Sequence, residues 1–273
     1  MASNTLREVS STDSAHLAKM MSSSAYLHRH LDWMPVLDWI GRRPFWLYDT
    51  PTGPLAALAC LEDPPGVAWV RLFLSALEAD PEKWFSTLFD RCLQDFPQDT
   101  LPIIPSLALS EWYAAILERN HFKLHQYIVA LHLDLSQPFP HVEFNPDLFI
   151  RWMEPEDIPA VTKIDWNAFE PIWQNSNQQV SLSYNQAYYA SVAEMNGQII
   201  GFQITTGSVF SAHLARLAVD PPFQGHGIGL ALLQDLAHFC RRQSLHEISL
   251  NTQSDNHASL SLYKRAGFKL GQE

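Results

Sequence analysis

The chain has 273 residues, a formal net charge of −11, and contents of 47% hydrophobic and 17% charged residues. This length fits two domains or one large domain, and the composition is typical of a folded globular protein, which excludes a disordered chain. The acidic balance argues against nucleic acid or an anionic membrane as a partner, because phosphate contacts need clustered Lys and Arg.

The cysteines and the apolar segments exclude further classes. Cys60, Cys92 and Cys240 match neither a disulfide framework nor a metal site, so we expect three reduced, mostly buried thiols and no metal. Residues 1–7 lack the pattern of a secretory signal, and no run of about 18 apolar residues is present to span a membrane. We therefore expect a cytoplasmic enzyme without a membrane partner.

Proline positions mark the expected domain boundary. The segment 136–146 contains Pro138, Pro140 and Pro146, and this density of proline blocks a helix or a central strand. We therefore predict a first domain over residues 1–137, a linker over 138–147 and a second domain over residues 148–273.

The second half begins with alternating strand and helix patterns. Residues Phe149–Met153 have the pattern of a strand, and the acids and proline of Glu154–Asp157 suit the start of a helix. A second helix is predicted over Tyr184–Ala190. Two strands joined by the type I′ turn pair Asn196-Gly197 follow. These strands are Ser191–Met195 and Gln198–Thr206.

The remaining elements again alternate. Ile228, Leu232, Leu236 and Phe239 form one apolar stripe at helical spacing. Gly267 suits the left-handed position that ends the last helix. In chain order these elements are a strand over His213–Val219, a helix from Gly227, a strand over Glu247–Thr252 and a helix over Asn256–Arg265.

The two halves resemble each other at a nearly constant offset. Leu117–Leu124 and Tyr263–Leu270 share Arg-x-x-Phe-Lys-Leu at an offset of 146, and Leu6-Arg7 and Ile150-Arg151 match at an offset of 144. An acid-containing turn and a helical pattern follow each Leu/Ile-Arg pair. Two anchors at nearly one offset indicate an internal duplication.

A glycine-rich loop lies between the strand ending at Val219 and the helix that follows. It reads Gln224-Gly225-His226-Gly227-Ile228-Gly229. The first N–H groups of a helix lack internal partners, the helix dipole adds positive potential, and glycines admit a ligand close to the backbone. Such a loop suits a diphosphate without any Lys, although it matches neither the Walker nor the Rossmann spacing.

The wider context of this loop resembles a known family. Gln224-x-x-Gly227-x-Gly229 follows Leu-Ala-Val-Asp-Pro, and Asn256-x-x-Ser259-x-x-Leu262-Tyr263-x-x-x-Gly267-Phe268 follows in the expected order. Both patterns resemble the signatures of the GCN5-related N-acetyltransferases (GNAT), over roughly Phe149 to the end. The resemblance implies an α/β (α+β) fold of two GNAT-like domains, each a mixed, mostly antiparallel twisted sheet flanked by helices. The first domain would be a degenerate copy.

The resemblance also implies roles for single residues. The CoA diphosphate would rest on the loop amides, and the pantetheine arm would run along the preceding strand like an added strand. Asn256 would contact the CoA arm, and Ser259 would either pack on its helix or touch CoA weakly. Tyr263 would be the general acid to the leaving thiolate, the alternative being a buried structural tyrosine. The loop residues are Gln224, Gly225, His226, Gly227, Ile228 and Gly229, and the strand residues are Leu217, Ala218 and Val219.

The general base stays open at this point. Asp165, Glu170 and His213 are candidates, and a water relay without any side-chain base is an alternative. We select Glu170, because it lies between the first two predicted helices, where the family builds its acceptor pocket; a solvated loop acid is the alternative. Five aromatic residues line either this pocket or the core: Trp166, Phe169, Trp173, Tyr184 and Tyr188.

Two departures from the family pattern have consequences. The loop corresponds in the first half to Glu78–Lys83, which has three acids and no glycine, so we expect residues 1–135 to bind no CoA. After Leu270 only three residues remain, so the usual last strand has no sequence. We expect the strand around His125–Leu133, or another chain, to cover the resulting sheet edge.

These observations predict an acetyl-CoA-dependent N-acetyltransferase, with acetyl-CoA as co-substrate and the amine attacking the thioester directly. The acceptor would be a primary amine, either a small molecule or a protein N-terminus, and the protein a monomer or homodimer. Two alternatives remain: a CoA-binding regulatory protein without turnover, and an acyltransferase that uses a longer acyl-CoA.

Overall fold

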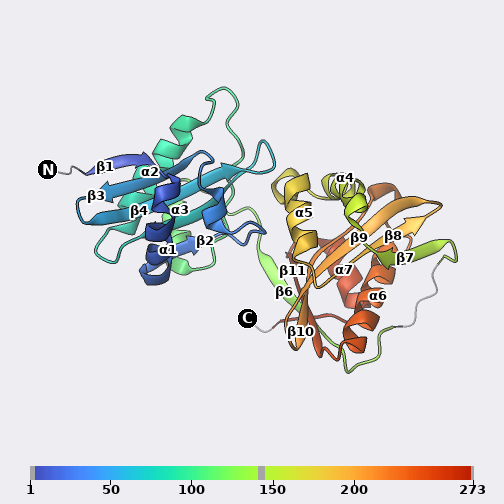
Figure 1. The fold of residues 1–273 in the computed structure, drawn as a ribbon. Helices are drawn as coiled ribbons and strands as arrows, with labels where there is room; N and C mark the ends of the chain where they lie inside the picture. The colour runs from blue at the N-terminus through green and yellow to red at the C-terminus, as the bar shows by residue number, and fades with distance from the viewer. Residues whose placement is uncertain (1–3, 141–144, 272–273) are drawn as a thin grey trace. The chain divides into compact units, whose positions relative to one another are not determined.

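The computed structural model describes residues 4–140 and 145–271, and the chain forms two compact units, Met1–Leu124 and His125–Glu273 (Figure 1). The division falls before the linker predicted over 138–147, of which residues 141–144 lie outside the described residues. Residues 125–137, which we predicted to belong to the first domain, therefore belong to the second unit.

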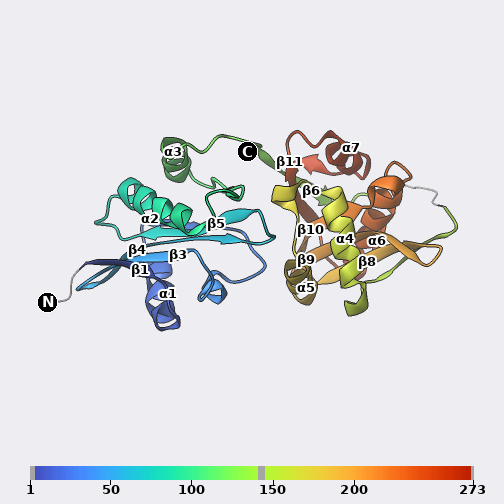
Figure 2. The ribbon, with the colours of Figure 1, turned by 90° about the horizontal axis from the view of Figure 1, so that it is seen from above.

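The first unit is a sheet with helices on both faces. Its strands are ordered β1-β3-β4-β5-β2 and each neighbouring pair is antiparallel. Helix α2 covers one face of the sheet and α1 covers the other (Figure 2). The strands are β1 (Thr5–Glu8), β2 (Tyr26–Arg29), β3 (Phe45–Thr50), β4 (Gly53–Glu62) and β5 (Ala68–Ser75), and the helices are α1 (Ser14–Ser23), α2 (Pro81–Asp95) and α3 (Glu111–Arg119), with short 3₁₀ turns η1 (Ser11–Asp13) and η2 (Val36–Trp39).

The second unit contains the larger sheet, ordered β12-β6-β11-β10-β9-β8-β7. Only the β10–β11 pair is parallel among the pairs of its described strands. The strands are β6 (Ile128–Asp134), β7 (Leu148–Trp152), β8 (Tyr189–Met195), β9 (Gln198–Gly207), β10 (Ser211–Val219), β11 (Glu247–Gln253) and β12 (Lys269–Leu270). The helices are α4 (Ile158–Ala168), α5 (Asn177–Asn185), α6 (Ile228–Arg242) and α7 (His257–Arg265), with 3₁₀ turns η3 (Pro155–Asp157), η4 (Pro171–Trp173) and η5 (Pro221–Phe223).

The second sheet is buried on both faces. Val192 and Phe202 pack in one cluster with Val161 of α4, whereas Ala193 and Val219 pack with residues of α6. Successive side chains of a strand point to opposite faces, so both faces need helices. A mixed sheet with helices packed on both faces confirms the predicted fold class.

The local patterns correctly predicted most elements of the second unit, with one error. Asn196 and Gly197 both have positive φ, of 53° and 75°, as a type I′ turn requires. The helix predicted over Tyr184–Ala190 is wrong: α5 ends at Asn185, and Tyr189 already pairs with Thr205 in the sheet. The ring of Tyr189 stacks on Phe239 at 4.0 Å, so tertiary packing decides its conformation.

The two halves share one local arrangement of an arginine and its acids. Arg7 donates to both carboxylate oxygens of Asp13, at 2.8 and 2.7 Å, and Arg151 does the same to Asp157, at 2.7 and 2.9 Å. The Nε of each arginine also reaches an acid one strand away, Asp49 or Glu194. The carboxylates of Asp13 and Asp157 each also accept from the backbone N–H three residues earlier, at 2.8 Å. The same local structure therefore recurs 144 residues later.

Strand β6 covers the edge that the short C-terminus would leave open. It pairs antiparallel with β11 from Ile128 to Asp134, and the two-residue strand β12 pairs with its other side. Of the two covers expected from the sequence, the strand that ends the first repeat is the one observed. Among the described residues, no helix is long and apolar enough to cross a bilayer.

Candidate active site

The start of α6 is open to a ligand. Gly227 is the residue before the helix and adopts a left-handed conformation, φ +83°, as does Gly225 at φ +80°. No side chain caps this helix end. A Cβ atom at either glycine would meet no atom within 4 Å, so the space beside these two residues is open. The first N–H groups of a helix have no partner within the helix. The diphosphate position at this helix start stays a prediction.

The other loop residues have mainly structural contacts. Gln224 Nε2 donates to the Val219 carbonyl at 2.9 Å, and His226 Nδ1 lies 2.9 Å from the Gln224 carbonyl. A Cβ at Gly229 would lie 3.0 Å from Leu262, so this glycine allows α6 to pack closely on α7. Gln224, His226 and Gly229 thus shape the loop, and their amides remain the predicted ligand contacts. Ile228 is buried under the loop and anchors the helix in the core.

Strand β10 has a free edge next to this loop. It pairs in parallel with β11 only from Ser211 to Leu214, and a β-bulge separates Leu214 from Arg216 in its pairing with β9. Beyond the bulge, no strand of the described residues pairs with the edge opposite β9. Leu217, Ala218 and Val219 lie there, where an extended ligand can pair with the backbone.

In the first unit, the positions that correspond to the helix start and to the unpaired strand edge are both occupied by residues of the same unit. The parallel bridge Val67–Ile103 lies 144 residues before the parallel pair Ser211–Glu247 at both positions, so the two registers correspond. Leu72–Ser75 then corresponds to Arg216–Val219, and this stretch is paired with β2. The start of α2 is capped by Asp80, which accepts from the N–H groups of Glu82 and Lys83 at 3.0 and 3.3 Å.

Tyr263 is buried on α7, with its ring 5.6 Å from that of Phe268. Burial raises the pKa of Tyr263 to about 12, and the nearby positive charge of Arg216 opposes this shift. The phenol is therefore protonated at neutral pH. Its hydroxyl has no hydrogen-bond partner within residues 4–140 and 145–271, so the O–H is available to a substrate.

Asn256 has a role that the sequence pattern did not reveal. Its Oδ1 accepts from the backbone N–H of Ser259 at 3.1 Å and so caps α7. The amide nitrogen of Asn256 is left to donate to a ligand. Ser259 itself is half-buried on the first turn of the same helix. Contacts of either residue with CoA remain predictions.

Two of the three candidate bases are engaged elsewhere. Asp165 is fully buried, and its oxygens accept from Arg216 at 2.7 and 2.9 Å and from the N–H of Asn175 at 2.8 Å. His213 lies 2.9 Å from the Ser249 hydroxyl, and burial lowers its pKa. Asp165 is therefore occupied by Arg216 and Asn175, whereas the third candidate, Glu170, has an exposed side chain.

Glu170 is exposed in the loop that joins α4 to α5, where its carboxylate lies 3.9 Å from His125 Nε2. In the same loop, Trp173 Nε1 donates to Gln126 Oε1 at 3.0 Å, and Gln126 in turn donates to Asp255 at 3.3 Å. Residues 125 and 126 lead into β6, so the segment between the repeats contacts the loop that joins α4 to α5. Sequence reasoning missed these contacts because they join positions far apart in the chain.

The remaining aromatic residues divide between the loop and the core. Phe169 and Trp173 lie in the loop with Glu170, and Trp166 donates from Nε1 to the Asn175 carbonyl at 2.7 Å. Tyr184 packs against the core cluster under α4. Tyr188 lies beside Phe239 of α6, with ring centroids 5.6 Å apart. Trp166, Phe169 and Trp173 therefore lie in or next to the loop that carries Glu170.

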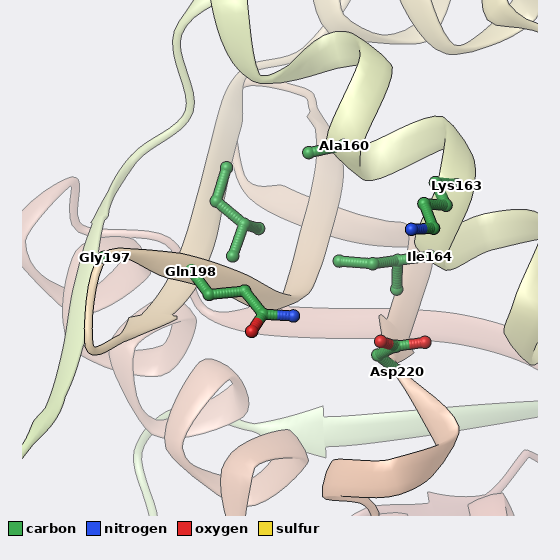
Figure 3. Close-up of a pocket in the computed structure, with 7 residues that line it drawn as sticks. Ala160, Lys163, Ile164, Gly197, Gln198 and Asp220 are labelled. Atoms are coloured by element: carbon green, nitrogen blue, oxygen red, sulfur yellow. The ribbon is translucent and has the colours of Figure 1, made fainter.

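A separate cavity of about 350 Å³ lies beside α4. Lys163, Gln198 and Asp220 bring an amino group, an amide and a carboxylate to it (Figure 3). Its floor is apolar, from Ala160, Ile164 and Ile199. It contains none of the predicted CoA contacts, and we assign it no part in the site.

The free cysteines are as expected from the sequence. Cys60, Cys92 and Cys240 are buried thiols, and burial raises the pKa of each. Such thiols are poor nucleophiles, so none of them competes for the catalytic role.

Comparison with known proteins places this geometry in context. Residues 158–268 match the model of the acetyltransferase (GNAT) family. Over 119 residues the chain is 29% identical to a [ribosomal protein bS18]-alanine N-acetyltransferase of Escherichia coli (strain K12), which covers 44% of this chain and 79% of that protein.

Two solved structures share the fold over almost the whole chain. A GCN5-related N-acetyltransferase from Sphaerobacter thermophilus has a TM-score of 0.63 at 19% identity and covers 98% of this chain and 92% of its own. A tandem GNAT protein from the clavulanic acid biosynthesis pathway has a TM-score of 0.63 at 14% identity, with coverage of 98% and 95%. Both similarities concern the fold.

Proposed function

We propose that this chain, whose second half carries an acetyltransferase domain of the GNAT family, transfers the acetyl group of acetyl-CoA to a primary amine. One observation carries the proposal. The uncapped start of α6 and the free edge of β10 adjoin each other in the second unit, whereas the corresponding positions of the first unit are filled. Two adjacent open features suit one ligand that has an anionic group and an extended arm.

The binding roles follow from these features. The backbone N–H groups from Gly225 to Gly229 hold the diphosphate, where the helix dipole favours negative charge. The arm pairs with the backbone of Leu217–Val219, and the free amide of Asn256 adds a donor. A site built from backbone amides needs no cluster of Lys or Arg, in agreement with the acidic composition of the chain.

The chemistry requires two proton movements. The neutral amine attacks the thioester carbonyl, a C–N bond forms, and the C–S bond breaks to release CoA as a thiolate. The nitrogen becomes positively charged as the C–N bond forms, and it loses a proton to Glu170, directly or by way of water. The thiolate receives a proton. The products are an acetamide and the free thiol of CoA.

Tyr263 acts on the leaving sulfur first as a hydrogen-bond donor. Its pKa of about 12 lies above the ~8.5 of a thiol, so complete proton transfer from the phenol to the thiolate is unfavourable. A strong hydrogen bond to the developing negative charge requires no such transfer. Solvent then replaces any proton that the phenol gives up.

We propose the α-amino group of a protein N-terminus as the acceptor, in line with the E. coli relative. An α-amino group has a pKa near ~7.7–8.0, so a substantial fraction is neutral at physiological pH. Such an acceptor suits a site in which the buried acid Asp165 is committed to Arg216 and the remaining acid, Glu170, is exposed. A lysine side chain, with a pKa near ~10.4, would need a stronger base.

A thermal-shift titration with acetyl-CoA and free CoA tests the binding step. A ligand at 100 times its dissociation constant stabilises the folded state by about 2.7 kcal/mol, so Tm should rise with both ligands. An unchanged Tm at millimolar acetyl-CoA would contradict the proposal.

Release of the CoA thiol tests turnover. We expect release with a peptide whose N-terminal residue is alanine and no release with the same peptide blocked at its N-terminus. Binding without release across a panel of amines would favour a regulatory CoA-binding protein instead. If acyl-CoA molecules with longer chains displace acetyl-CoA at lower concentrations than acetyl-CoA itself requires, the result would favour a longer acyl group as the one transferred.

A further inference from the structure

Arg216 is a charged residue in a strand that is otherwise mostly small and apolar. The side chain is 14% exposed, and its guanidinium lies 3.6 Å from the ring centroid of Phe169. A buried charge is costly unless its partners compensate it, so the contacts of Arg216 identify what it serves.

Every described hydrogen-bond partner of Arg216 belongs to α4 or to the loop that follows. Nε and Nη2 donate to the two oxygens of Asp165, at 2.7 and 2.9 Å, and Nη2 also donates to the Trp173 carbonyl. Asp165 in turn accepts from the N–H of Asn175. Residues 169, 173 and 175 of the loop thus converge on a single ion pair.

The loop Phe169–Asn175, which we call the acceptor loop, has further polar contacts, and its first residue, Phe169, packs against the core cluster under α4. Gln174 Nε2 donates to the carbonyls of Trp166 and Phe169, at 3.0 and 3.1 Å, and Trp173 is fixed by Gln126. None of the residues 169–175 is fully buried. Because the loop is only partly buried and three of its residues contact the Arg216–Asp165 pair, we expect its position to depend on that pair.

The position of Arg216 along β10 links this loop to the other half of the site. Ala215 is the extra residue of the bulge, and bulges re-aim the side chains that follow them. Arg216 comes next, at the point where β10 leaves β11 and its free edge begins. One residue therefore borders both the strand proposed for the pantetheine arm and the loop proposed for the amine.

We propose that Arg216 is a positioning residue that holds the acceptor loop in register with the cofactor strand and so determines how the amine binds. This inference rests on the proposed function for its substrates, whereas the effect on the loop is independent of it. Arg216 touches no reacting atom in this scheme and acts through Asp165, Trp173 and Phe169.

The test compares the full-length chain with Arg216→Lys and Arg216→Met, and uses Arg151→Met as the matched control. Arg151 also donates two hydrogen bonds to an aspartate, Asp157, but its described contacts lie at β7, β8 and η3. Lysine keeps the charge next to Asp165 but loses the planar fork and the stacking on Phe169, so Arg216→Lys should fold even where Arg216→Met does not.

Hydrogen exchange measured by mass spectrometry is the first readout. We expect exchange in peptides covering residues 169–175 to quicken by about tenfold or more in Arg216→Lys, with exchange at residues 224–229 unchanged and the loop unchanged in Arg151→Met. Unchanged exchange at residues 169–175 in Arg216→Lys overturns the inference, whether or not the chain proves to be an acetyltransferase.

Steady-state kinetics with the alanine-initiated peptide and acetyl-CoA are the second readout. We expect KM for the peptide to rise about tenfold in Arg216→Lys, and KM for acetyl-CoA to stay within about twofold. A rise only in the KM for acetyl-CoA, or an equal rise in the KM for the peptide in Arg151→Met, overturns the inference. If the wild-type chain fails to turn over the peptide, the proposed acceptor is wrong, and the exchange measurement alone decides the role of Arg216.

Discussion

At the scale of single residues, burial and local partners separate catalytic candidates that look alike in the sequence. Asp165 and Glu170 are both acids of the same segment, yet Asp165 is locked to Arg216 and Glu170 is exposed. The motif that contains Tyr263 was recognisable from its spacing alone. The partner of Asp165 was not, because Arg216 lies 51 residues further along the chain. Sequence spacing records local structure, whereas the protonation of a side chain depends on neighbours from other elements.

Replacing Tyr263 with phenylalanine removes the donor and keeps the ring that packs on Phe268. We expect kcat to fall by about 10- to 100-fold, at the lower end of general-acid effects, because the phenol donates without full proton transfer. The acetyl-CoA dissociation constant, measured by calorimetry, should stay within about twofold. Unchanged turnover in Tyr263→Phe would assign the residue a packing role only.

The pH dependence of the wild-type enzyme follows from the same side chain. Burial favours the neutral phenol and raises its pKa to about 12, so the donor persists through the neutral and mildly alkaline range. We expect kcat/KM to rise as the acceptor α-amine loses its proton near pH ~8, and then to show no fall below about pH 10. A decline between pH 8 and 9 in a stopped assay would show that another acid controls the rate.

At the scale of elements, the two repeats differ at the start of one helix and along one strand edge. The hairpin at Asn196-Gly197 was predictable because the turn pair fixes its own geometry. Helix α5 was misplaced, since the strand that begins at Tyr189 depends on packing against Phe239. The position of the glycine loop at the start of a helix was predictable, and its role as a phosphate site stays a prediction. The free edge of β10 was not derivable from local pattern. It depends on the register of β10 with β11, a pairing between distant segments.

A charge placed at the start of α6 should mimic the capped helix of the first unit. In Gly227→Asp the carboxylate lies where the diphosphate is proposed to bind, so we expect acetyl-CoA to bind at least about 100-fold more weakly. Gly227→Asn is the control, because asparagine also tolerates the left-handed conformation but carries no charge. Equal affinities of the two variants in calorimetry would move the diphosphate away from this loop.

At the scale of the whole molecule, the boundary between the repeats in sequence is not the boundary between the units in space. Strand β6 closes the second sheet at β11, although it follows the first repeat in the chain. The composition of the proline-rich segment suggested the later boundary. The proline content of this segment does not indicate that the strand before it, β6, pairs with β11 of the second sheet. A strand edge that lacks its partner exposes unpaired N–H and C=O groups and tends to aggregate.

The unit division predicts which fragments fold. We expect residues 125–273 to unfold cooperatively on heating and to bind acetyl-CoA, because they retain β6. Residues 148–273 lack it and should aggregate or unfold at a lower temperature, as circular dichroism and light scattering would show. Equal stability of the two fragments would mean that β6 is dispensable.

The stoichiometry of binding tests the difference between the two units. Asp80 and β2 occupy the positions in the first unit that are open in the second, so we expect one acetyl-CoA per chain in calorimetry. Asp80→Ala should leave that stoichiometry unchanged, because β2 still pairs with Leu72–Ser75. A second molecule bound by the wild-type chain would contradict the proposed loss of the first site.

The pairing of β2 with β5 also limits how the protein can change over time. The Asp80 cap contributes about 1 kcal/mol to the helix it precedes, and the β2 ladder satisfies backbone groups that would otherwise be unpaired. A cofactor site in the first unit would require removal of both, and each removal alone lowers stability without creating affinity. Single substitutions are therefore not expected to build a cofactor site in the first unit, because the helix cap and the strand pairing occupy the two positions together.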